Sequence, residues 1–223
     1  MDANLGRIFI SFLVLVFSLT VHESAHAWAA DRLGDPTARL LGRLSLNPMV
    51  HIDPIGTVLF PLVGLFTGAP IIGWAKPVPV ATWRFERPRR DYLMVAAAGP
   101  LSNLALAFVA VVALRLIPAG SGAASLFGGG PSPAASAGRV LAPIDHLVET
   151  MLGLNLLLAI FNLLPIPPLD GASVLAGLLP EHLAARLDRL RPYGFLLLYA
   201  LLLSGGFSLV VGVPYRHLLS WLQ

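Results

Sequence analysis

Two histidines and a glutamate in the segment His22-Glu23-Ser24-Ala25-His26 are the residues of this sequence best placed to carry out chemistry. Residues four apart share one face of an α-helix, so the imidazoles of His22 and His26 can bind the same metal ion. Glu23 lies beside them, where its carboxylate can accept a proton from a metal-bound water molecule. The spacing therefore predicts a catalytic zinc site. A polar pocket or a proton path without a metal is the alternative interpretation.

A third protein ligand is expected, because a catalytic zinc ion usually has three and leaves a fourth position for water. Asp170 is favoured, since Pro165, Pro167 and Pro168 must unwind the helix that ends before it. Glu149, near the start of the same apolar segment, is the alternative carboxylate. The chain has no cysteine, and its other histidines fall in predicted loops or at the ends of apolar segments: His51, His146, His182 and His217.

These polar residues lie in a strongly apolar chain of 223 residues, of which 56% are hydrophobic and only 12% are charged. Soluble domains carry roughly 25% charged residues, so the composition excludes both a water-soluble domain and intrinsic disorder. The net charge of +3 is explained by basic cytoplasmic loops of a membrane protein. We therefore expect a lipid bilayer around the chain and no nucleic-acid partner.

Four segments, residues 8–30, 92–117, 144–164 and 193–213, approach or exceed the roughly 20 apolar residues that cross a bilayer. A fifth, residues 55–73, is interrupted by prolines and glycines, which favour a broken helix or a re-entrant hairpin. A cleaved signal peptide at the N-terminus is disfavoured, because the His22–His26 motif interrupts its apolar run.

Three motifs resemble, in order, those of the site-2 protease family of intramembrane zinc metalloproteases. They are His22–His26, the run Ala98-Gly99-Pro100-Leu101-Ser102-Asn103, and the run from Phe161-Asn162 to Asp170-Gly171. The similarity covers roughly residues 5–180. It implies an all-α polytopic membrane protein and an endopeptidase that hydrolyses peptide bonds in or near transmembrane segments of membrane protein substrates.

The resemblance also implies roles for individual residues. One zinc ion per chain would be held by His22, His26 and Asp170. Glu23 would act as general base and acid toward the zinc-activated water, and Asn162 would lie near the scissile carbonyl.

The middle motif opens the next core helix in that family. Its residues Gly99, Pro100 and Asn103 are candidates for substrate binding or for close packing between helices. A strand-like element near residues 72–78, which includes Trp74, would pair with an unwound substrate by β-addition. The alternative is an interfacial anchor with Trp74 and Lys76 at the lipid headgroups.

Two further residues, His51 and Asp53, could contribute polar groups near the site. A simple turn before the hairpin is the favoured interpretation of the segment that contains them.

The zinc site constrains the topology, because the C-terminal ends of residues 8–30 and 144–164 must reach the same side of the membrane. That condition favours re-entry of residues 55–73, four crossings, and an N-terminus outside the cell. Basic residues mark the cytoplasmic side, and 11 of the 15 then share the side of the zinc site. They are Arg32, Arg39, Arg43, Lys76, Arg84, Arg87, Arg89, Arg90, Arg186, Arg189 and Arg191. We expect a multi-pass protein of the cell membrane with its active site nearer the cytoplasm.

Residues 1–223 are expected to form one integral-membrane protease domain, with a flexible extramembrane loop at 118–143. The chain thus resembles compact family members without a PDZ or CBS module. Other interpretations are a membrane zinc protease with its site outside the bilayer, a metal or proton transporter, and an inert binder of membrane segments. The first expects a second motif with a glutamate ligand, and a transporter this small would show half-helix repeats; neither feature is evident in the sequence.

Overall fold

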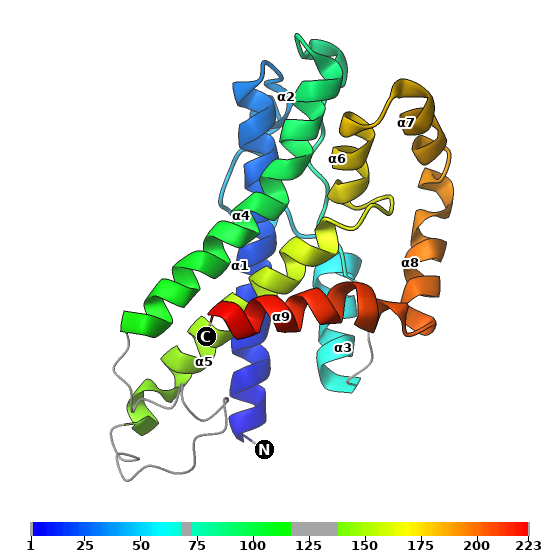
Figure 1. Cartoon of the computed structure of the whole chain (residues 1–223). Coiled ribbons are helices and arrows are strands. Elements are labelled where there is room, and N and C mark those ends of the chain that lie inside the picture. The colour runs from blue at the N-terminus through cyan, green and yellow to red at the C-terminus, as the bar shows by residue number, and fades with distance from the viewer. Residues whose placement is uncertain (1, 68–72, 117–137, 223) are drawn as a thin grey trace.

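The computed structural model of the chain describes residues 2–67, 73–116 and 138–222. Three long helices form its centre: α1 (Asp2–Arg32), α4 (Pro88–Leu116) and α5 (Gly138–Asn162). Helices α1 and α5 run in the same direction and α4 runs in the opposite one (Figure 1). The C-terminal end of α1 therefore lies at the same end of the molecule as the two short helices that come directly after α5, Asp170–Leu178 and Glu181–Asp188 (Figure 1).

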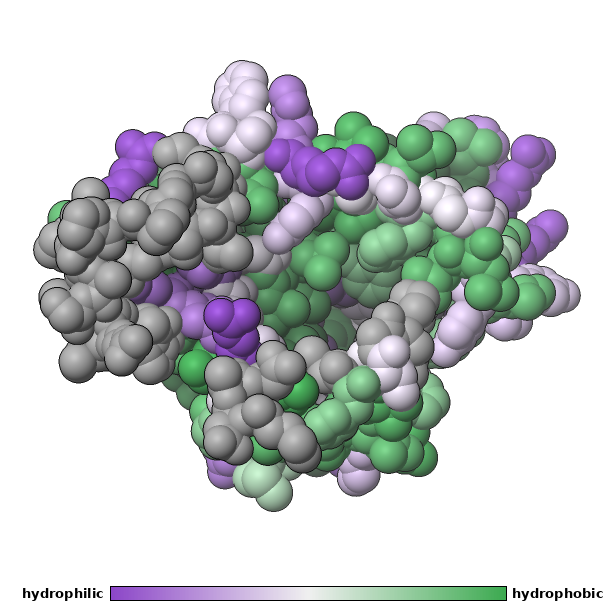
Figure 2. All heavy atoms as spheres, turned by 90° about the horizontal axis from the view of Figure 1, so that it is seen from below, coloured by the Kyte–Doolittle hydropathy of each residue, from purple (hydrophilic) through white to green (hydrophobic). Residues whose placement is uncertain are grey.

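Each of these three helices contains a stretch long and apolar enough to cross a membrane: Leu5–Arg32, Pro88–Leu116 and Ile144–Asn162. Large hydrophobic side chains are exposed at every fourth position of α1, at Leu5, Phe9, Leu13 and Phe17. Seen from below, hydrophobic side chains cover much of the described surface (Figure 2). This surface suits contact with lipid tails, and it agrees with the expected multi-pass membrane protein.

Helix α4 packs closely against α5 where the side chains of α4 are small. Ala107, Ala110 and Val111 of α4 pack against Leu152 and Leu156 of α5 in one buried cluster. Small residues let helix backbones come close together, which increases van der Waals contact in the absence of a hydrophobic driving force from water.

Four short elements follow α1 in the described chain, up to residue 67. They are α2 (Thr37–Leu40), η1 (Pro48–Val50), the π-helix η2 (Pro54–Leu59) and α3 (Phe60–Thr67). The apolar helix Pro54–Gly64 is too short to cross a bilayer. The Trp74 N–H donates a hydrogen bond to the Gly56 carbonyl at 3.0 Å, so the chain is back beside the start of this helix by residue 74. This return is the behaviour expected of a hairpin and differs from that of a fifth crossing.

The expected strand-like element at 72–78 is wrong for the part that the structure describes. Residues 73–80 adopt no regular secondary structure, and the described residues contain no β-strand. Pro77 and Pro79 lack N–H donors, which prevents a continuous ladder. The segment instead makes isolated hydrogen bonds, such as that from Lys76 N–H to the His51 carbonyl at 2.9 Å. It then leads through η3 (Thr82–Arg84) into α4.

The motif Gly99–Asn103 lies in the middle of α4, which corrects the expectation that it opens a helix. Helix α4 begins eleven residues earlier at Pro88, a residue well suited to the first helical turn because it has no N–H to leave unpaired. The predicted loop at 118–143 lies mostly outside the described residues, but residues 138–143 already belong to α5.

The predicted crossing at 193–213 is bent rather than straight. After α6 (Asp170–Leu178), α7 (Glu181–Asp188) and η5 (Arg191–Tyr193), the chain forms α8 (Gly194–Leu203), η6 (Ser208–Gly212) and α9 (Val213–Leu222). The helical stretches Glu181–Leu203 and Ser208–Leu222 meet at 78°, so the described residues contain three candidate spans, or four if this bent pair counts as one. Gly205 adopts φ +74° at the bend, a conformation that glycine adopts readily. Helix α9 then crosses α5 (Figure 1).

Candidate active site

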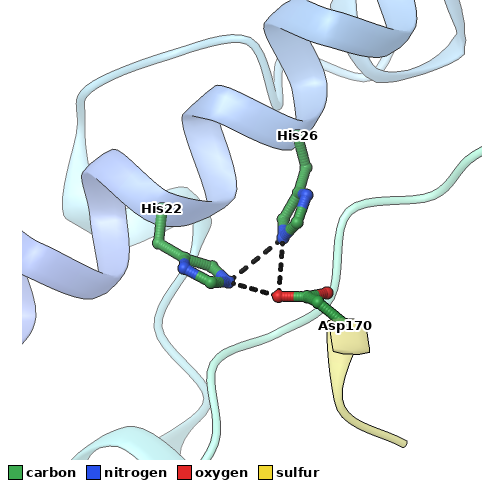
Figure 3. A group of neighbouring side chains, drawn as sticks. All are labelled: His22, His26 and Asp170. Carbon is green, nitrogen blue, oxygen red and sulfur yellow. Dashed lines mark hydrogen bonds and ion pairs between the residues drawn. The ribbon is translucent and has the colours of Figure 1, made fainter. Parts of the chain in front are cut away.

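Helix α1 presents His22 and His26 on one buried face, as their spacing predicts. Their side chains are almost inaccessible, at 4% and 8% relative exposure, and their Nε2 atoms lie 3.1 Å apart. Asp170 Oδ2 lies 3.0 Å from His22 Nε2 and 3.4 Å from His26 Nε2 (Figure 3). Within the described residues, these three side chains are the one group of histidines and carboxylates close enough to share a metal ion. The structure thus brings Asp170, and not Glu149, to the histidines.

A non-helical segment between α5 and α6 leads to Asp170, which is the first residue of α6. Helix α5 ends at Asn162 and α6 begins at Asp170. Between them, Leu164 and Leu169 are buried with Leu198 and Val211 of the C-terminal helices in one cluster. A Cβ at Gly171 would collide with the backbone of Leu163, so only glycine lets the first turn of α6 come this close to the end of α5.

Hydrogen bonds on the far sides of the imidazoles determine which nitrogens face Asp170. His22 Nδ1 lies 2.6 Å from Asn103 Oδ1, and His26 Nδ1 lies 2.7 Å from the Val95 carbonyl oxygen. Both partners are acceptors, so each Nδ1 carries the proton and each Nε2 keeps its lone pair. Asp170 Oδ2 is buried and has no hydrogen-bond donor in the described part of the chain. Three lone-pair atoms that face one another repel unless a cation lies between them, which is the chemistry of a metal site with histidine and carboxylate ligands.

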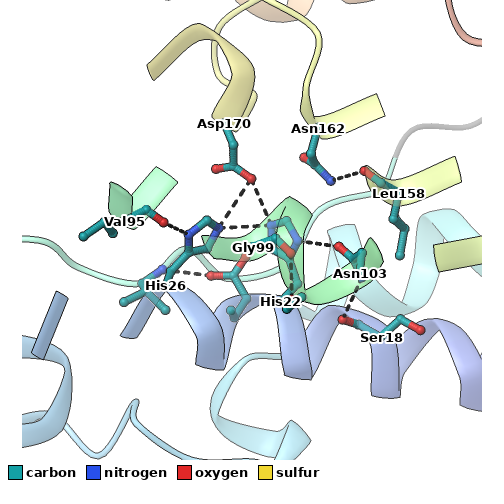
Figure 4. Close-up of polar contacts among 12 residues, drawn as sticks. Ser18, His22, His26, Val95, Gly99, Asn103, Leu158, Asn162 and Asp170 are labelled. Atoms are coloured by element: carbon teal, nitrogen blue, oxygen red, sulfur yellow. Dashed lines mark hydrogen bonds and ion pairs between the residues drawn. The ribbon is translucent and has the colours of Figure 1, made fainter. Parts of the chain in front are cut away.

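Gly99 leaves room for the faces of both histidines. A Cβ at this position would lie 2.6 Å from His22 Nε2 and would also collide with His26 Nε2. Asn103 lies one turn further along α4, and its amide oxygen contacts the other side of the His22 ring (Figure 4). Gly99 therefore leaves space for both imidazoles, and Asn103 contacts the His22 ring directly. Pro100, which lies between these two residues in the sequence, is buried.

A cavity of about 470 Å³ opens onto the three candidate ligands. Glu23 lines it, and Glu23 Oε2 accepts a hydrogen bond of 3.1 Å from the Val78 N–H. Asn162 also lines the cavity and donates from Nδ2 to the Leu158 carbonyl at 2.9 Å. The Glu23 carboxylate and the Asn162 amide predicted from the sequence thus line the same cavity as the histidines and Asp170, and Figure 4 shows Asn162 beside them.

Trp74 forms one wall of this cavity. Its ring packs edge-on against Phe60 at 5.3 Å and Phe195 at 6.0 Å between centroids. A Cβ at Gly56 would lie 2.5 Å from the indole, so the π-helix passes directly against it. These contacts hold Trp74 within the protein, which disfavours the role of a headgroup anchor.

His51 and Asp53 lie outside the cavity and support the hairpin. His51 is 2% exposed and its Nε2 lies 2.8 Å from the Ser45 carbonyl oxygen. Asp53 Oδ1 accepts hydrogen bonds from the N–H groups of Ile55 and Gly56. Their turn-forming role agrees with the favoured interpretation of this segment.

Sequence reasoning missed two residues that support the site. Buried Arg43 donates to the carbonyl groups of Lys76 and Pro77 at 2.5 and 3.3 Å, and so holds a segment of which Pro77 lines the cavity. Asn155 is completely buried and hydrogen-bonds to Asn103. A sequence signal for Asn155 did exist, because it is a polar residue inside an apolar segment, two helical turns before Asn162.

An all-helical chain with membrane-length helices, a buried His-Glu-x-x-His motif and a convergent aspartate defines a membrane-embedded metallohydrolase. The comparison with known families agrees: the profile of Peptidase family M50 matches residues 10–204. The chain belongs to this family, the site-2 protease family, and is a zinc metalloprotease.

Three relatives carry names of the same kind. The "Putative zinc metalloprotease YwhC" of Bacillus subtilis is 38% identical, over 86% of this chain and 79% of its own. The "Putative zinc metalloprotease Rip2" of Mycobacterium tuberculosis is 30% identical, over 84% of this chain and 64% of its own. Rip2 of Mycolicibacterium smegmatis is 29% identical, over 85% and 64%. No solved structure matches the chain significantly.

Proposed function

We propose that this chain hydrolyses peptide bonds in or beside the transmembrane segments of membrane protein substrates, using one zinc ion held by His22, His26 and Asp170. One observation carries the proposal: three lone-pair atoms, two from the membrane-length helix α1 and one from the start of α6, converge on a cavity that is also lined by Glu23. Ionisable groups at such depth are costly, so a functional reading is the default.

The polar residues of the cavity have separate roles in the proposed reaction. When bound, zinc supplies Lewis-acid chemistry that polarises the substrate carbonyl and makes water more acidic. Glu23 takes a proton from the attacking water and passes it to the departing amine. The Asn162 amide has two N–H donors, of which one binds Leu158. The other is available to stabilise negative charge on the carbonyl oxygen.

A substrate helix must unwind before hydrolysis, because its peptide bonds are shielded by the hydrogen bonds of the helix. The cavity is lined by six residues of the irregular segment before α4: Gly73, Trp74, Ala75, Pro77, Val78 and Val80. We propose that this segment and Trp74 contact the unwound stretch of substrate.

The proposed topology places the site nearer the cytoplasm of a multi-pass cell-membrane protein. Helices α1 and α5 run in parallel, and the short helices α2, α6 and α7 lie at the end opposite the N-terminus (Figure 1). Residues 31–91 and 170–192, which include these helices, carry 11 of the 15 basic residues, and basic residues mark the cytoplasmic side. The segment at 55–73 then dips in from that side and returns. Residues 1–223 act as one protease domain, with its motifs within residues 5–180.

Zinc content and cleavage of a model transmembrane substrate test the proposal together. The Glu23→Gln variant should keep its zinc and lose cleavage. The Asp170→Ala variant should lose both, and Glu149→Gln, at the alternative carboxylate, should lose neither. Equal cleavage by Glu23→Gln and the wild type would refute the role of Glu23. Full zinc in Asp170→Ala would refute the ligand set.

A further inference from the structure

A chain of buried amide groups connects the backbone of α5 to His22. Ser18, Asn103 and Asn155 come from three different helices and are all 0% exposed. Asn155 Nδ2 donates to the Met151 carbonyl and to Ser18 Oγ, each at 2.9 Å. Asn103 Nδ2 donates to Asn155 Oδ1 at 2.8 Å, and Asn103 Oδ1 lies 2.6 Å from His22 Nδ1.

The direction of these hydrogen bonds is fixed at Met151, because a backbone carbonyl can only accept. Asn155 must therefore turn its NH2 group toward Met151 and its oxygen toward Asn103. Asn103 in turn must direct its NH2 group to Asn155 and its oxygen to His22. An oxygen at His22 Nδ1 requires the proton on that nitrogen and leaves the lone pair on Nε2, which lies 3.0 Å from Asp170 Oδ2.

We propose that Asn155 is a positioning residue that selects the metal-binding tautomer of His22 by fixing the orientation of the Asn103 amide. The proposal rests on the metal site proposed above. His26 needs no such relay, because its Nδ1 faces the backbone carbonyl of Val95 directly. His22 Nδ1 faces the side-chain amide of Asn103 in place of a backbone carbonyl. The oxygen of an amide accepts a hydrogen bond and its NH2 group donates one, so the orientation of Asn103 decides which partner His22 meets.

The other acceptor for Asn103 is too distant to replace Asn155. Asn103 Nδ2 lies 3.5 Å from the Ser18 carbonyl oxygen, compared with 2.8 Å from Asn155 Oδ1. A hydrogen bond weakens strongly at the longer distance. Without Asn155 the Asn103 amide can rotate by half a turn and direct N–H toward His22 Nδ1. The imidazole proton then moves to Nε2, which can no longer bind a metal.

The test is the zinc affinity of the full chain in detergent, measured by competition with a chelator after the metal has been removed. Asn155→Leu should weaken zinc binding by about tenfold, the lower end of the effect of lost outer-shell partners. Ser18→Ala keeps the Met151 anchor and should bind zinc as the wild type does. Leu156→Ala removes the neighbouring buried side chain, which is 2% exposed. It should lower stability and leave zinc affinity unchanged.

Wild-type zinc affinity in Asn155→Leu would overturn the proposal, and so would an equal loss of affinity in Leu156→Ala. Failure of the metal site is a separate outcome, in which Asp170→Ala binds zinc as tightly as the wild type. Nitrogen NMR of labelled histidines in the metal-free wild type gives a readout that needs no folded variant. We expect a proton on His22 Nδ1, and an unprotonated Nδ1 would overturn the proposal.

Discussion

Replacing Gly99 by alanine is the sharpest perturbation of the site that the structure offers. The new Cβ would lie 2.6 Å from both Nε2 and Cε1 of His22, and it would overlap His26 Nε2. Ordinary van der Waals contact begins at 3.4 Å, so the His22 ring must move away by about 0.8 Å. The ring cannot easily absorb this shift, because Asn103 holds its opposite nitrogen at 2.6 Å.

The expected result is a stable protein with a damaged metal site. Ligand distances in a zinc site are held to within about 0.2 Å, so a displacement several times larger removes a ligand. A misplacement of about 1 Å costs on the order of 100-fold in rate, and we expect at least that loss in kcat/KM. The helix itself should be more stable, because alanine is favoured over glycine in a helix interior by about 1 kcal/mol.

The assay combines zinc content, cleavage of a model transmembrane substrate and thermal unfolding in detergent. Gly6→Ala is the matched control, because a Cβ at this position of α1 meets no atom within 4 Å. It should share the gain in helix stability and retain zinc and cleavage. If Gly99→Ala also retains stoichiometric zinc and full cleavage, Gly99 does not provide room for the ligands.

Three further predictions follow from the supports of the site. Gly171→Ala should lose zinc as Asp170→Ala does, because its Cβ meets the fixed backbone of Leu163; normal zinc content would contradict this. Leu198→Ala should lower the free energy of unfolding by about 2–5 kcal/mol, since Leu198 is 2% exposed in the cluster behind Asp170, and chemical denaturation measures the change. Burial raises the pKa of Asp35, but hydrogen bonds from Thr37 and Ala81 together with the nearby Arg84 hold it below its ordinary 3.8. The stability contributed by Asp35 should therefore be present above about pH 4 and be lost as the pH falls through its lowered pKa. Asp35→Asn should be less stable by about 1–3 kcal/mol at neutral pH, with a smaller loss on acidification, and an unchanged acid transition would refute this.

Local features of the sequence were sufficient to predict the type of chemistry at the site and much of the fold. The i, i+4 spacing of His22 and His26 determines a shared helix face without reference to any other element. The prolines before Asp170 interrupt a helix wherever it packs, and apolar runs of membrane length predict the three long helices. These are properties of short sequence segments, so they survive into the folded chain.

Contacts between distant segments decided what those local features could not. A hydrogen bond from Trp74 to Gly56 joins the returning chain to the start of the hairpin. The irregular residues after Trp74 form isolated contacts in place of the expected strand. The bend at Gly205 replaces a straight crossing, because α9 packs against α5.

The sequence by itself determined that His22 and His26 can bind one metal ion and that Glu23 can take the proton, since ligand type and helical spacing are local. Only the tertiary structure decided that Asp170, and not Glu149, joins the histidines, and how these residues are held. It places Gly99 against both imidazoles and Asn103 behind one of them, and it brings Asn155 into the same buried network. The physical reason is that the tautomer of a histidine, and the space around its ring, depend on atoms from other helices. The residue spacing within α1 gives no information about where those atoms lie.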